Sequence, residues 1–127
     1  MEFNGIGIGI SDFKALRLRI NYFIDKTMYI KDIIDNQSGV VLITRPRRFG
    51  KTLNMSMLRY FFDCNVKDSK VLFDGLKIME QGEKYTSKLG AYPCIYLTLK
   101  DVNDSNYENM LLDLKTAILE MYREHRY

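Results

Sequence analysis

An apolar run that ends in a basic turn constrains the fold of this chain most. Residues 40–43 are all apolar, and three of the four are β-branched; Gly39 precedes them and Arg45-Pro46 follows. A run without polar residues is typical of an internal strand in a parallel sheet, covered on both faces. Beyond the turn, residues 51–62 carry the pattern of a helix that is apolar on most sides. We therefore expect a buried strand, a turn and a deeply packed helix, in that order.

The remaining patterns extend this alternation. They predict a short helix over 12–17 after Ser11, followed by an extended stretch over 18–24. A second helix is predicted over about 26–35, with Asp25 as its N-cap. Further along the chain, the patterns predict a helical turn at 71–73 and a second strand over 94–99. Ser105 and Glu108 form a capping box before a final helix. The order of strand, helix, strand and helix predicts an α/β fold, with helices flanking a parallel sheet.

Composition excludes several classes of protein. The chain has 127 residues, of which 46% are hydrophobic and 28% charged, with a net charge of +3. These values are typical of a globular domain rather than a disordered tail or a disulfide-rich module. Cys64 and Cys94 form no metal-binding pair, and both are predicted to be buried free thiols. The chain shows neither a secretory signal nor a membrane-spanning apolar run, so we expect a cytoplasmic protein that does not contact membranes.

The candidate ligand-binding residues are concentrated at the turn between the predicted strand and helix. Gly50, Lys51 and Thr52 stand there in the order that a phosphate-binding P-loop requires. Gly50 would let the backbone approach phosphate oxygens, and the first N–H groups of the helix would favour an anion. Lys51 would reach the outer phosphates, and the Thr52 hydroxyl would hold Mg²⁺.

This loop departs from the usual P-loop pattern at one position. Arg45 stands where the first glycine of G-x-x-x-x-G-K-[ST] is expected. With Arg47, Arg48 and Lys51, it nevertheless places four positive charges within seven residues, which favours a polyphosphate ligand. The alternative is a solvated basic turn in which the G-K-T sequence occurs by chance.

Four segments of the chain resemble the AAA-ATPase-like family of bacterial and archaeal proteins: residues 7–13, 22–27, 42–58 and 92–97. The R-P-R-R-F-G-K-T sequence is typical of this family, whose members are P-loop NTPases by prediction and are often followed by a nuclease-like domain. The resemblance implies ATP and Mg²⁺ as cofactors, with Thr52 as the metal ligand. The nucleotide-binding residues that it implies are Arg47, Arg48, Phe49, Gly50, Lys51, Thr52 and Leu53.

In that family, the acidic strand that completes the magnesium site lies beyond the last helix of this chain. The resemblance therefore implies an incomplete, N-terminal part of a P-loop NTPase-like domain. Residues 1–39 would form a lead-in with short helices, and residues 40–127 a β-α-β-α core. Asp101 is the one fallback for the missing acid, so we expect this chain alone to be inactive as an ATPase.

Two other functions stay open at this point. The chain could be a non-catalytic interaction module on a decayed P-loop scaffold. It could also contact nucleic-acid phosphates through the arginine cluster, which the nearly balanced net charge disfavours. A sheet of only two strands would leave apolar faces uncovered, so we also expect self-association.

Overall fold

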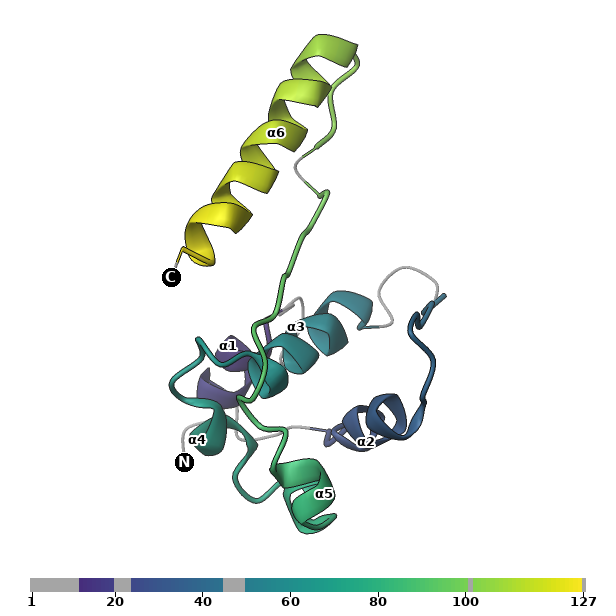
Figure 1. Ribbon diagram of the computed structural model, residues 1–127, viewed down its shortest axis with the longest axis vertical. Coiled ribbons are helices and arrows are strands. Elements are labelled where there is room, and N and C mark those ends of the chain that lie inside the picture. Colours follow the sequence, from purple (N-terminus) through teal and green to yellow (C-terminus); the bar gives the residue numbers. More distant parts are fainter. Residues whose placement is uncertain (1–11, 20–23, 45–49, 101, 127) are drawn as a thin grey trace. The chain divides into compact units, whose positions relative to one another are not determined.

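The computed structural model describes residues 12–19, 24–44, 50–100 and 102–126. It divides into two compact units, one ending at Tyr92 and the other beginning at Pro93. Figure 1 shows the helices in chain order, coloured from purple to yellow.

The first unit is built from short helices. They are α1 (Phe13–Arg19), α2 (Met28–Asp35), α3 (Lys51–Phe62), α4 (Ser69–Phe73), the 3₁₀ helix η1 (Lys77–Glu80) and α5 (Glu83–Thr86). Helix α1 packs on α3 and α4, and η1 packs on both α2 and α5. The predicted helix over 51–62 is confirmed at both ends, and α4, followed by Gly75 in the left-handed region, confirms the predicted helical turn at 71–73.

Aromatic rings form the centre of the first unit. Phe61 is fully buried and meets Phe62 and Phe73 edge to face, with ring centroids 5.0 and 5.2 Å apart. Phe13 stacks on Phe73 at 4.9 Å and so joins α1 to the same cluster. Ring pairs in these geometries add to the stability that burial alone provides. This cluster positions α3, whose first turn carries the candidate functional residues.

The predicted parallel sheet is wrong for the part of the chain that the structure describes. Residues 40–44 are irregular, and the side chains of Val40 and Leu42 are each 84% exposed. Residues 94–99 are irregular as well, with Ile95 71% exposed. A single parallel bridge joins Asp63 to Tyr92, and the described residues contain helices but no strand. An apolar run becomes a strand only where a neighbour pairs with its backbone, and no described segment pairs with either run.

Two helix starts differ from the predicted ones. Asp12 accepts a hydrogen bond from the Ala15 N–H at 2.9 Å, so it caps α1, whereas the predicted cap Ser11 lies outside the described residues. Helix α6 (Tyr107–Glu124) in the second unit begins after Asn106, whose side chain accepts from the Glu108 N–H at 2.9 Å. Asn106 therefore takes the place of the predicted capping residue Ser105, because a short side chain one position later reaches the same free donors.

Three smaller expectations also need correction. Helix α1 continues through Arg19, so the extended stretch predicted from residue 18 does not begin there, and residues 20–23 lie outside the described part. The helix predicted over about 26–35 begins at Met28 and ends at Asp35, and Thr27 rather than the predicted Asp25 occupies its N-cap position. Cys64 is exposed and Cys94 half-buried, so the prediction of two buried thiols is wrong; each lies in a segment that is not packed into the core.

Candidate functional site

Helix α3 begins with a backbone arrangement suited to an anion. Gly50 precedes the helix with φ 77° and ψ 21°, in the left-handed region that side-chain-bearing residues rarely adopt. Its carbonyl oxygen accepts from the Asn54 N–H at 2.9 Å and closes the first turn. Because glycine has no side chain to cap the helix, the N–H groups that follow stay available at the positive end of the helix dipole.

The residues of the first turn divide into exposed and anchoring ones. Lys51 and Thr52 are exposed, so their polar groups can meet a ligand from solvent. Leu53 is partly buried against the hydrophobic core and holds this end of the helix in place. The structure thus places Gly50–Leu53 together at the predicted start of the helix, but without the predicted strand before them among the described residues. Arg45, Arg47, Arg48 and Phe49 lie outside the described residues.

A cavity of about 820 Å³ opens beside this turn. Its lining comes from three segments of the first unit: Lys26, Tyr29, Val41, Leu42, Ile43, Thr44, Lys51, Asn54 and Met55. The volume lies in the usual range for small-molecule sites, which combine an apolar wall with a few polar groups. Among the described residues, the lining contains two lysines and no carboxylate, so its charge favours an anionic ligand.

The N-terminal approach to α2 is tied to η1 by one carboxylate. Asp25 accepts hydrogen bonds from the Thr27 N–H at 2.9 Å, from the Thr27 hydroxyl and from the Lys77 N–H at 2.8 Å. Partial burial acts to raise the pKa of Asp25, but these hydrogen bonds outweigh it and hold the pKa below its ordinary value. The buried Thr27 hydroxyl also accepts from the Ile78 N–H at 3.2 Å. Lys26 lies between these two fixed residues.

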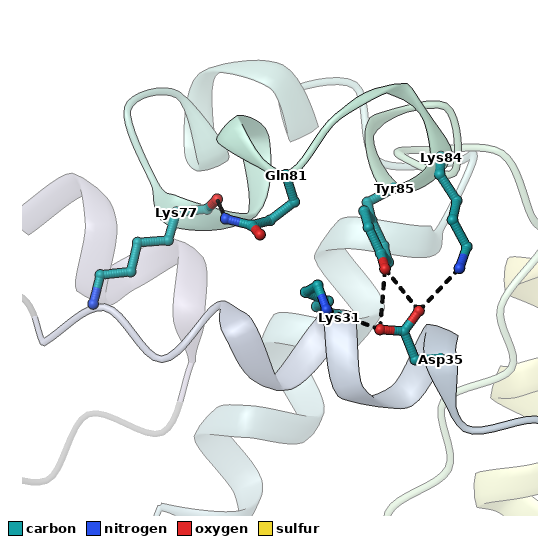
Figure 2. Close-up of polar contacts among 6 residues, drawn as sticks. All are labelled: Lys31, Asp35, Lys77, Gln81, Lys84 and Tyr85. Carbon is teal, nitrogen blue, oxygen red and sulfur yellow. Dashed lines mark hydrogen bonds and ion pairs between the residues drawn. The ribbon is translucent and has the colours of Figure 1, made fainter.

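The other end of α2 is tied to α5 by Asp35, as Figure 2 shows. Its carboxylate accepts from the Tyr85 hydroxyl at 2.7 Å, from Lys31 Nζ at 3.0 Å and from Lys84 Nζ at 3.1 Å. The hydrogen bond from Tyr85, followed by the one from Lys31, lowers the pKa of Asp35 to about 2. Helix α2 is therefore held at both ends, which fixes the side of the cavity that it lines.

Comparison with known proteins identifies the family. Residues 7–127 match the family model described as a predicted AAA-ATPase. The chain belongs to the AAA-ATPase-like family. This match covers almost the whole sequence and confirms the resemblance noted from its motifs. No curated protein and no solved structure shows significant similarity to the chain.

Only part of the cavity lining could be expected from the sequence. Asn54 and Met55 follow Lys51 by one helical turn, so the period of the predicted helix was enough to place them beside it. Lys26 and Tyr29 were missed because they lie more than twenty residues upstream. Their place at the cavity comes from the way α2 packs, for which the motif carries no signal.

The described residues do not form a metal-binding site by themselves. They contain no group of three or more His, Cys, Asp or Glu side chains arranged to hold one. Magnesium that arrives with a polyphosphate keeps several waters and needs only one or two protein oxygens. The exposed Thr52 hydroxyl can supply one such oxygen, and Asp101 lies outside the described residues.

Within the described part of the chain, no helix combines the length and the apolar character needed to cross a bilayer.

Proposed function

We propose that this AAA-ATPase-like chain binds ATP, with the phosphates at the N-terminus of α3. The observation that carries the proposal is the exposed Lys51 directly after left-handed Gly50, at the edge of a cavity with no described carboxylate in its lining. Backbone N–H groups, a helix dipole and an ammonium group on one side of a cavity favour a phosphate group there. Family membership supports the same reading.

Each residue of the turn has a distinct role in this proposal. Lys51 contacts the outer phosphates, and the Thr52 hydroxyl supplies one oxygen to Mg²⁺ bound with them. Gly50 permits close approach of the backbone, and Leu53 anchors the turn to the core. Arg47, Arg48 and Phe49 immediately precede the turn in sequence, and the two arginines add positive charge to it.

Thermal unfolding with and without ATP and Mg²⁺ tests the proposal. A ligand that binds only the folded chain stabilises it by about 2.7 kcal/mol at 100 times its dissociation constant, so ATP should raise the melting temperature clearly. Lys51→Ala should remove the shift and leave the circular dichroism spectrum unchanged, because Lys51 is exposed. Lys67→Ala serves as the control, because Lys67 is also exposed and is not among the lining residues of the cavity. Equal ATP shifts in the wild-type and Lys51→Ala chains would refute the assignment.

A second candidate function is a non-catalytic interaction module. It is favoured by the exposed apolar side chains of Val40 and Leu42, which no described neighbour covers. A chain of this kind would show no ATP-dependent stabilisation and would associate through that segment. The third alternative, contact with nucleic-acid phosphates, predicts binding to DNA or RNA that weakens steeply with salt.

A further inference from the structure

We infer that Lys26 is a second phosphate-binding residue of this site, and that the ligand is a nucleoside polyphosphate held between Lys26 and Lys51. This inference rests on the proposed function, and it adds to that function a residue outside the loop motif. It also assigns the two lysines to separate groups of the phosphate chain, because they line the cavity from different segments.

The charge of the cavity is the first observation. Lys26 and Lys51 both line it, from the approach to α2 and from the start of α3. Neither ammonium group forms an ion pair with a described carboxylate, whereas Lys14, Lys31 and Lys84 all do. The positive charges of two lysines beside one cavity repel each other. An anion bound between them would replace this repulsion with attraction to both lysines.

The fixed backbone around Lys26 is the second observation. Asp25 and Thr27, on either side of it, are hydrogen-bonded to each other and to the backbone of η1. The lysine side chain is exposed, but its Cα therefore stays in one place beside the cavity. Preorganisation of this kind reduces the ordering cost of binding. It distinguishes Lys26 from a lysine on a surface loop.

The apolar wall completes the argument for a nucleoside. Tyr29 is half-buried on α2, one turn after Lys26, and lines the cavity with Val41 and Met55. An aromatic ring and aliphatic side chains suit the flat face of a base, whichever base it is. The cavity thus combines two cations with an apolar surface, which matches a ligand that has a polyphosphate at one end and a base at the other.

Calorimetric titration of the full chain with three probes tests the inference. The probes are ATP, inorganic tripolyphosphate and AMP, each measured with wild-type, Lys26→Gln, Lys51→Ala and Lys67→Gln chains. Lys26→Gln should raise the dissociation constants of ATP and tripolyphosphate by about 3- to 10-fold, as expected for loss of one exposed charged contact. It should change AMP binding less than about twofold, since a single phosphate is satisfied at α3. Lys67→Gln should match the wild type for all probes.

The outcomes separate this inference from the proposed function. If ATP binds in a Lys51-dependent manner but Lys26→Gln binds ATP and tripolyphosphate like the wild type, the second phosphate contact is refuted and the proposed function stands. If Lys26→Gln weakens the binding of AMP as much as the binding of ATP, the polyphosphate assignment is refuted. If the wild-type chain binds neither ATP nor tripolyphosphate, both proposals are refuted. A circular dichroism spectrum that matches the wild type confirms that each variant is folded.

Discussion

The Tyr85 hydroxyl donates a hydrogen bond to the Asp35 carboxylate, with 2.7 Å to one oxygen and 3.0 Å to the other. This contact joins α5 to the C-terminal end of α2 across 50 positions of sequence. Lys31 and Lys84 bind the same carboxylate from either side. The four residues therefore form one network that fixes α2, and with it the α2 side of the proposed nucleotide cavity.

Replacing Tyr85 by phenylalanine should lower the midpoint of thermal unfolding. The Tyr85→Phe variant keeps the buried ring and removes only the hydroxyl, so the loss reports on the hydrogen bond to Asp35 rather than on packing. Tyr107→Phe is the matched control, because Tyr107 is 68% exposed. Differential scanning calorimetry measures both variants. A midpoint for Tyr85→Phe equal to that of the control would show that the network contributes no stability.

The same network predicts acid sensitivity. The pKa of Asp35 is lowered from 3.8 to about 2, so its contribution to stability is present above its ordinary pKa and is lost as pH falls toward about 2. The direction follows because the unfolded chain takes up a proton at higher pH than the folded chain does. Urea unfolding of wild-type and Asp35→Asn chains between pH 5 and pH 2 measures the effect. The stability of Asp35→Asn should depend less steeply on pH in the acid range; parallel curves would contradict the assignment.

Removing the central ring of the core should lower the free energy of unfolding far more than removing an exposed side chain. Phe61 is fully buried between Phe62 and Phe73, so Phe61→Ala should reduce the free energy of unfolding by about 3–5 kcal/mol. Val71 lies on the nearby α4 with 69% of its surface exposed, and Val71→Ala should change stability by about 0.5 kcal/mol or less. Equilibrium urea unfolding gives both values. Phe61→Leu, a milder change, extends the series if Phe61→Ala is too unstable to measure.

Exposed apolar side chains predict self-association. Val40 and Leu42 are each 84% exposed, and no strand in the described part of the chain covers their segment. Burying such side chains against a second copy would remove apolar surface from water. Sedimentation velocity at micromolar concentrations should show a species larger than a monomer, and the double variant Val40→Lys, Leu42→Lys should shift it toward monomer. A monodisperse wild-type monomer would contradict the prediction.

Binding and hydrolysis make different demands on this chain. Phosphate release with ATP and Mg²⁺ should not exceed that of Lys51→Ala, because no described carboxylate lines the cavity to hold the metal from a second side or to orient water. Positioning of this kind can supply roughly 7–11 kcal/mol of barrier reduction. Release that depends on Lys51 would show that an acid is already present in the chain, and Asp101→Asn would then test the remaining candidate.

The local features of this protein follow from its amino-acid sequence. The limits of α3 follow from the apolar period of residues 51–62 and from the glycine before them, because the hydrogen bonds of a helix close within a few residues. The G-K-T turn and the wider motif were likewise enough to identify the family and to place Gly50, Lys51 and Thr52 in one turn.

Features that depend on contacts between residues far apart in the sequence follow from the tertiary structure and not from any local pattern. The apolar runs at 40–43 and 94–99 carry the pattern of buried strands, yet both are irregular, because a strand needs paired neighbours that its own residues do not encode. The place of Lys26 beside the cavity also depends on contacts with residues far away in the sequence. Asp25, Thr27 and Asp35 accept hydrogen bonds from residues some fifty positions away, and these bonds hold α2. No period or spacing along the chain reports such contacts.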